Sequence, residues 1–168
     1  DEVADLNLDV KYSTPVRGRD PEAHLVKTAD GEFPYSKCLI STGATPNRVG
    51  FPRDCGYEPL VLHSMKDAEA LKVVLDDPDV ERVLVSGASM VALKTVEAAL
   101  AKGKSVSLVG MNPHVLDFNA LPAAAERFER GLENKGVQLF LGQTIQSVEV
   151  LENADAKLRV TFSTGAVE

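Results

Sequence analysis

Residues 83–110, VLVSGASMVALKTVEAALAKGKSVSLVG, place a glycine between a short apolar strand and a helical pattern, and a second apolar strand follows. This order is typical of a dinucleotide-binding turn, where the unpaired N–H groups of the first helical turn and the helix dipole attract phosphate. In the usual G-x-G-x-x-G pattern, the first glycine permits the tight turn, the second admits the pyrophosphate, and the third allows close helix–strand packing. Residues 87–92 are therefore a candidate phosphate-binding turn.

Three positions of this turn depart from the pattern. Gly87 keeps the first role and Ala92 is a tolerated form of the third, but Ser89 places a Cβ and a hydroxyl where the pyrophosphate would pass closest. That hydroxyl could donate to a phosphate oxygen, whereas its bulk would push the nucleotide outward. Gly110 stands near the usual position of the ribose-binding acid and offers neither a carboxylate nor a cation. The motif alone therefore fits either a nucleotide site or plain strand–helix packing.

The elements that position this turn follow from hydrophobic periodicity and capping signals. Strands are expected at residues 82–86, 105–109 and 137–142, and helices at about 63–77, 89–102 and 120–135. Ser64 and Asp67 form a weak capping box, and Gly103 is a natural helix stop. Residues 144–165 alternate as a hairpin around a polar turn at 153–156, and residues 8–13, 23–32 and 34–42 predict an antiparallel β-meander with an Asp30-Gly31 turn.

This order predicts an α/β fold. A Rossmann-like parallel sheet occupies residues 60–168, a β-meander segment occupies residues 1–48, and a linker rich in proline and glycine joins them at residues 49–59. Nothing after the hairpin supplies a closing strand or helix, so we expect the second domain to be incomplete at its C-terminal end.

Composition narrows the class of protein. The 168 residues are 44% hydrophobic and 26% charged, as in soluble globular proteins, and the net charge of −7 gives no basic footprint for nucleic acid. The sequence shows no membrane segment and no signal peptide, so we expect a soluble intracellular protein whose compartment the sequence does not specify. Cys38 and Cys55 are too far apart for a C-x-x-C site, and no metal site is expected. His114 follows the second strand, where the adenosine half of a nucleotide could lie, although a structural role is the simpler interpretation.

Several segments together resemble a known family. PYSKCLISTGATPNR, residues 34–48, is similar to a Y-D-x-L-x-x-A-T-G-A-x-P segment, and residues 82–110 are similar to a second glycine-rich turn. Residues 63–75 and 120–150 resemble the elements on either side of that turn. The family is the FAD-dependent pyridine nucleotide-disulfide oxidoreductases, specifically the ferredoxin, rubredoxin and nitrite reductases and the proteins like apoptosis-inducing factor.

The resemblance implies a cofactor set and a set of site residues. Such an enzyme binds FAD, takes a hydride from NADH or NADPH, and passes electrons to an acceptor protein or small molecule. FAD would be held mainly by segments outside this chain, so the remainder of the flavoprotein or a partner subunit is an implied partner. No side chain is implied as a catalytic acid, base or nucleophile. The residues implied near the flavin are Thr42, Gly43, Ala44 and Pro46, and those implied to face the pyridine nucleotide are Gly87, Ala88, Ser89, Met90, Ala92 and Gly110.

The departures from the family keep an alternative open. Lys94 stands where the family has a glutamate, and Ser89 and Gly110 are altered as well. These three residues favour a non-catalytic scaffold or partner-binding subunit, derived from a reductase, that has lost nucleotide binding. The intact segment at residues 42–46 favours the pyridine-nucleotide-binding part of a flavoprotein oxidoreductase, which is the function we expect.

Overall fold

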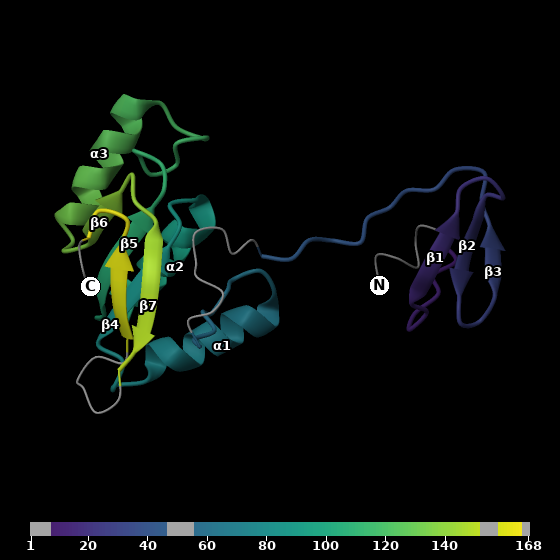
Figure 1. The fold of residues 1–168 in the computed structure, drawn as a ribbon, viewed down its shortest axis with the longest axis horizontal. Helices are drawn as coiled ribbons and strands as arrows, with labels where there is room; N and C mark the ends of the chain where they lie inside the picture. The colour runs from purple at the N-terminus through teal and green to yellow at the C-terminus, as the bar shows by residue number, and fades with distance from the viewer. Residues whose placement is uncertain (1–7, 47–55, 152–157, 166–168) are drawn as a thin grey trace. The chain divides into compact units, whose positions relative to one another are not determined.

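The computed structural model describes residues 8–46, 56–151 and 158–165. Its contacts divide the chain into two units, Asp1–Ala44 and Thr45–Glu168 (Figure 1). Antiparallel strands build the first unit, and helices around a parallel sheet build most of the second, so the predicted α/β class is confirmed. Residues 49–55 of the predicted linker and the predicted turn at residues 153–156 lie outside the described residues, whereas residues 56–59 are described and contain no helix or strand. The predicted domain bounds stay a prediction.

The first unit is a three-stranded antiparallel meander in the order β1-β2-β3. Its strands are β1 (Val16–Asp20), β2 (Leu25–Thr28) and β3 (Glu32–Pro34). The predicted turn at residues 30–31 is present, and the Thr28 N–H donates to the Gly31 carbonyl at 2.9 Å.

Two predicted strands of this meander are wrong. Residues 8–13 contain no strand, and the third strand ends at Pro34, where the prediction had it begin. Pro34 has no N–H to donate to a neighbouring strand. Leu39 beyond it is 91% exposed, so the apolar residues there do not pack against another layer as those of a half-buried strand would. β1 was missed because its sequence, VRGRD, is charged and contains glycine, and pairing with β2 overrides that weak propensity.

The second unit is built on a parallel sheet in the order β4-β5-β6. Its strands are β4 (Arg82–Ser86), β5 (Ser105–Gly110) and β6 (Gln138–Leu141), and the crossovers are α2 (Met90–Ala101) and α3 (Pro122–Glu133). All five elements lie within three residues of their predicted bounds. β5 is the central strand and is buried from Val106 to Gly110, as expected for a parallel strand covered on both faces.

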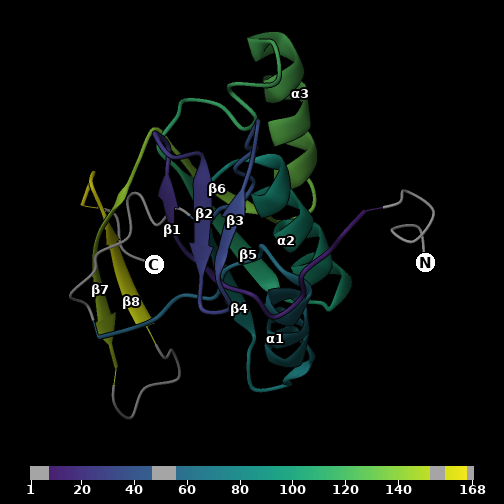
Figure 2. The ribbon, with the colours of Figure 1, turned by 90° about the vertical axis from the view of Figure 1, so that its right-hand side faces the viewer.

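Two apolar clusters lie on opposite faces of this sheet. Leu108 belongs to the cluster made with the helices, whereas Val109 belongs to the cluster made with Phe162. Successive strand residues point to opposite faces, so β5 contributes to both clusters. The predicted hairpin is β7 (Ile145–Val150) with β8 (Leu158–Phe162), and Figure 2 shows it on the side of the sheet away from α2. The sheet is therefore the middle of three layers.

Helix ends in the second unit are closed by polar contacts. α1 (Met65–Asp76) begins with the predicted capping box: the Ser64 Oγ accepts from the Asp67 N–H, and the Asp67 carboxylate accepts from the Ser64 N–H at 2.7 Å. At its other end, Asp76 forms ion pairs with Lys102 and with Lys72. Hydrogen bonds from Lys102 and then Lys72 lower the pKa of Asp76 to about 2. This contact links the C-terminal ends of α1 and α2.

Among the described residues, no helix combines the length and the apolarity needed to span a bilayer. That part of the chain also holds no group of three histidine, cysteine, aspartate or glutamate side chains placed to bind a metal ion.

Candidate functional site

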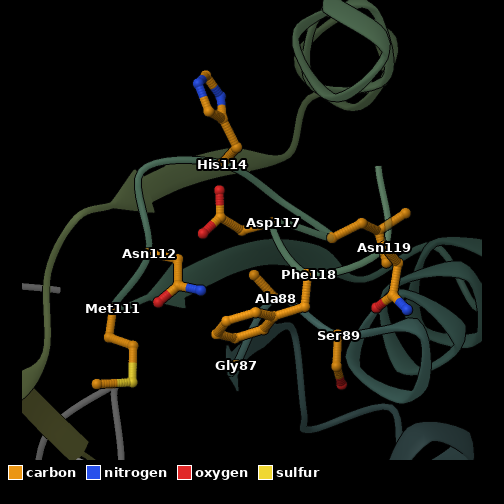
Figure 3. Close-up of a pocket in the computed structure, with 10 residues that line it drawn as sticks. Gly87, Ala88, Ser89, Met111, Asn112, His114, Asp117, Phe118 and Asn119 are labelled. Carbon is orange, nitrogen blue, oxygen red and sulfur yellow. The ribbon is translucent and has the colours of Figure 1, made fainter. Parts of the chain in front are cut away.

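A pocket of about 200 Å³ opens at the carboxyl ends of β4 and β5. This edge of a parallel sheet is where open α/β folds bind their ligands. The turn after β4 forms one side of the pocket, and residues 111–119, here called the β5–α3 loop, form the other (Figure 3). The lining residues are Gly87, Ala88, Ser89, Met111, Asn112, His114, Leu116, Asp117, Phe118 and Asn119.

The turn itself has the backbone that a phosphate-binding turn requires. Gly87 has φ +115°, which strains any L side chain, and its N–H donates to the Val109 carbonyl at 2.8 Å. Ala92 is buried beneath the turn, 3.9 Å from the place where a Cβ on Gly87 would stand. The predicted close packing of helix against strand is therefore present, and Ala92 shares a buried apolar cluster with Val85 of β4.

Ser89 occupies a backbone conformation open to any residue, with φ −84° and ψ 173°. It is the N-cap of α2, and its Oγ accepts from the Ala92 N–H at 3.5 Å. The hydroxyl is thus turned toward its own helix, and the departure from glycine has a local stabilising role. Met90 is the first helical residue and is exposed, but it does not line the pocket.

The donor groups at this turn suit a phosphate. The N–H groups of Met90 and Val91, in the first turn of α2, have no intrahelical partner by the geometry of any α-helix. The positive end of the helix dipole lies at the same place. The residues present therefore fit the pyrophosphate of a dinucleotide.

Gly110 has a packing reason that the sequence did not reveal. It is buried, and a Cβ built on it would lie 2.9 Å from the Ala88 Cβ and 3.4 Å from a Leu141 methyl carbon. Real Cβ atoms essentially never come that close to a neighbour, so no side chain fits at position 110 unless the turn shifts. An acid at the end of this strand would therefore require the turn at Ala88 to shift.

The β5–α3 loop is held in place from several sides. The Leu116 N–H donates to the Ala88 carbonyl at 2.9 Å, and the Gly142 N–H donates to the Asn112 carbonyl at 2.9 Å. On α3, the Glu129 Oε1 accepts from the Val115 N–H at 2.9 Å, while the Val115 side chain is fully buried. The loop is therefore a fixed wall of the pocket.

Of the residues in this loop, only His114 was considered near a nucleotide from the sequence. The Nδ1 of His114 lies 3.3 Å from the Glu129 Oε1, so this histidine joins the pocket wall to α3. Asn112, Asp117 and Phe118 were not predicted at all. The available signal was a polar loop directly after a predicted central strand, at the edge where α/β proteins bind ligands.

The remaining predicted residues lie elsewhere. Thr42, Gly43, Ala44 and Pro46 are exposed and have no regular secondary structure, and their predicted place near a flavin stays a prediction. Lys94 lies on the exposed side of α2, pairs with Glu97 at 2.8 Å, and does not line the pocket. The charge reversal at Lys94 therefore does not act through the pocket wall.

Comparison with known proteins finds curated relatives that are named as NAD(+) reductases. Rubredoxin-NAD(+) reductase from Acinetobacter baylyi is 28% identical over 165 residues, which cover 95% of this chain and 42% of that protein. Nitric oxide reductase FlRd-NAD(+) reductase from Salmonella newport is 30% identical over 158 residues, which cover 94% of this chain and 40% of that protein. The chain thus spans about two fifths of the length of these relatives.

Solved structures and a family model agree with this placement. The ferredoxin reductase for the CYP199A2 system from Rhodopseudomonas palustris has a TM-score of 0.80 at 24% identity, covering 99% of this chain and 40% of that one. That likeness shows a shared fold. The family model described as pyridine nucleotide-disulphide oxidoreductase matches residues 2–167. Because this match extends over nearly the whole chain, the chain belongs to the pyridine nucleotide-disulphide oxidoreductase family.

Proposed function

We propose that this chain is the pyridine-nucleotide-binding part of a flavoprotein oxidoreductase, which moves electrons from NADH or NADPH through FAD to an acceptor. The observation that carries the proposal is the pocket at the carboxyl ends of β4 and β5, bounded by the Gly87 turn. The relatives' names, two NAD(+) reductases, favour this function over the scaffold alternative. Since the chain spans only about two fifths of those relatives, the whole reaction is proposed for a larger protein or assembly.

The pocket would hold one part of the nucleotide. Its volume of about 200 Å³ lies below the roughly 300–1,000 Å³ of whole small-molecule sites. We assign the pyrophosphate to the first-turn N–H groups of α2, and the adenosine to the β5–α3 loop. Phe118 is 90% exposed, and its ring is drawn beside the turn in Figure 3, so it offers an aromatic surface for the adenine base.

The flavin, when bound, supplies the hydride-accepting chemistry, and this chain binds and orients the nucleotide. The FAD itself is proposed to be held mainly by segments outside this chain. The acceptor is proposed to be a small electron-carrier protein, because the relatives are named for rubredoxin and FlRd. An intracellular location follows as part of the proposal, because NADH and NADPH are intracellular metabolites.

A matched pair of glycine substitutions tests nucleotide binding at the turn. Gly87 and Gly103 lie at opposite ends of α2, and both have positive φ, +115° and +72°. Alanine strains the backbone at either position, but only Gly87→Ala deforms the pocket. We expect Gly87→Ala to weaken NADH binding by about tenfold or more and Gly103→Ala to change it less than about twofold, as measured by isothermal titration calorimetry.

Equal losses in both variants would indicate a general effect on folding, and the turn would then not be the site. Ser89→Gly is a further check on the same turn. This substitution removes the hydroxyl and the Cβ, whose bulk would push the nucleotide outward, so tighter NADH binding is expected. The lost helix cap should cost only a few tenths of a kcal/mol.

A further inference from the structure

Position 110 lacks the carboxylate that usually selects NADH, and any side chain there would force the turn to shift. A carboxylate that accepts hydrogen bonds from the two ribose hydroxyls also repels the 2′-phosphate of NADPH, so its position decides the choice between the two nucleotides. In this chain Gly110 is in contact range of Ala88, and any Cβ there would stand 2.9 Å from the Ala88 Cβ. A group that discriminates between NADH and NADPH would therefore have to lie in another part of the pocket wall.

The pocket wall contains one carboxylate, that of Asp117. None of the ten lining residues is a lysine or an arginine, so the lining offers no fixed cation for a 2′-phosphate. Asn112 and Asn119 contribute neutral amides, and the His114 ring is directed to Glu129. Among the described residues, the Asp117 carboxylate has no hydrogen bond or ion pair, so its acceptor oxygens are available to a ligand.

The position of Asp117 is fixed by its neighbours. Leu116, the residue before it, donates its N–H to the Ala88 carbonyl of the turn at 2.9 Å and also has a positive φ of +55°. The Asn119 N–H returns to the Leu116 carbonyl. Val115 is buried and tied to Glu129. Asp117 is therefore presented by a backbone that is hydrogen-bonded directly to the phosphate-binding turn, and Figure 3 shows it on the loop that faces Ala88.

We propose that Asp117 is the specificity-determining residue of this site: it takes the role of the missing strand-end acid, accepts hydrogen bonds from the adenosine ribose hydroxyls, and selects NADH over NADPH. This inference rests on the proposed nucleotide-binding function. A carboxylate is a strong acceptor for hydroxyl donors, and a 2′-phosphate would place about two negative charges beside it. The same site would therefore bind NADH and reject NADPH without any side chain at position 110.

Calorimetric titration of the intact chain with NADH and with NADPH tests the inference. We expect the unmodified chain to bind NADH about tenfold more tightly than NADPH. Asp117→Asn keeps the shape and removes the charge, so NADH should bind more weakly, NADPH more tightly, and the ratio should approach one. Asp79→Asn, an exposed aspartate before the opposite end of β4, is the matched control and should leave the ratio unchanged.

A salt series on the unmodified chain gives a second measurement that needs no variant. Because salt screens an exposed carboxylate from a phosphate, the preference for NADH should narrow as ionic strength rises. Asp117→Asn should show no such narrowing.

The outcomes separate the two proposals. If the unmodified chain binds nucleotide but Asp117→Asn keeps the same ratio, or if NADPH binds more tightly, the role of Asp117 is overturned while the nucleotide site stands. If neither nucleotide binds the unmodified chain, the proposed function fails and this inference fails with it.

Discussion

The two units of this chain differ in their internal packing. Between residues 8 and 44, every described residue is exposed or partly exposed, and the meander has no buried side chain. In the second unit, α1, α2 and α3 contribute to one apolar cluster and the β7–β8 hairpin forms another, so the sheet β4-β5-β6 is covered on both faces. Strand pairing alone therefore makes a sheet in the first unit, whereas the layers on both faces of the sheet make a core in the second.

This difference predicts where stability lies. A small sheet without a covered face is at best marginally stable in water, whereas a covered parallel sheet buries apolar surface on both sides. Since every described helix belongs to the second unit, the helical circular dichroism signal reports that unit alone. Unfolding followed by this signal can therefore separate the two regions.

The largest expected effect comes from paired phenylalanine truncations. Phe162 is fully buried and its ring centre lies 4.6 Å from that of Phe140, whereas Phe33 in β3 is only partly buried. Phe162→Ala should lower the free energy of unfolding by about 3–5 kcal/mol through lost burial and a cavity. Phe33→Ala should leave the urea midpoint of the helical signal nearly unchanged. Similar losses in both variants would mean that the meander shares the core's stability.

An intermediate effect is expected from two glycines in strands. Gly110→Ala places a Cβ 2.9 Å from Ala88, whereas Gly18→Ala in β1 meets no atom within 4 Å. We expect Gly110→Ala to cost about 1–3 kcal/mol of unfolding free energy from overpacking. Gly18→Ala should change it by less than about 0.5 kcal/mol.

The close contact at Gly110 can be tested by relief. If the Ala88 Cβ is the obstacle, the double variant Gly110→Ala with Ala88→Gly should be less destabilised than the sum of the single variants, in urea unfolding. Additive losses would contradict the contact as the reason for glycine at this position.

The smallest effect on stability is expected from protonation of Asp76 at low pH. The pKa of Asp76, held at about 2 by Lys102 and Lys72, is below its ordinary value of 3.8, so its ion pairs stabilise the fold above about pH 4. That contribution is lost as the pH falls from about 4 toward 2 and the carboxylate is protonated. The urea midpoint of the helical signal should therefore decrease less between about pH 4 and about pH 2 in Asp76→Asn than in the unmodified chain.

Asp20 in the meander is the matched control. Its pKa is also lowered, chiefly by the backbone N–H of Ala23, but this contact is local to the first unit. Asp20→Asn should therefore leave the acid slope of the helical signal unchanged. A flattened slope in Asp20→Asn would contradict the separation of the two regions.

The accuracy of the sequence-based predictions follows the same division. In the second unit, the bounds of strand β4 are predicted to the residue and the capping box at Ser64 is confirmed. The apolar periodicity succeeds there because its apolar residues are the ones that the folded unit buries. In the meander, apolar residues such as Leu39 and Ile40 are exposed, so the pattern that predicted a strand corresponds to no buried face. Apolar periodicity therefore predicts a strand or helix correctly where another layer of the fold covers the apolar face of that element.

The candidate site was only partly accessible from the sequence. The turn at residues 87–89 is recognisable because its chemistry lies in consecutive residues. The contact between Gly110 and Ala88 and the return of the β5–α3 loop to the turn join residues distant in sequence, and no local pattern encodes them. The loss of an acid at position 110 therefore resembled damage, whereas the structure gives it a packing reason.

The order of the parallel strands also has a consequence for folding kinetics. β1, β2 and β3 pair through short turns, and such hairpins form in about microseconds, but without a core they do not persist. β5 pairs with β4 and β6 only after two helical crossovers have brought them together, and such non-local pairing is slow. The meander is therefore expected to form first and to be the less stable region, whereas the edge of the sheet that bears the pocket needs β5 in place and forms later.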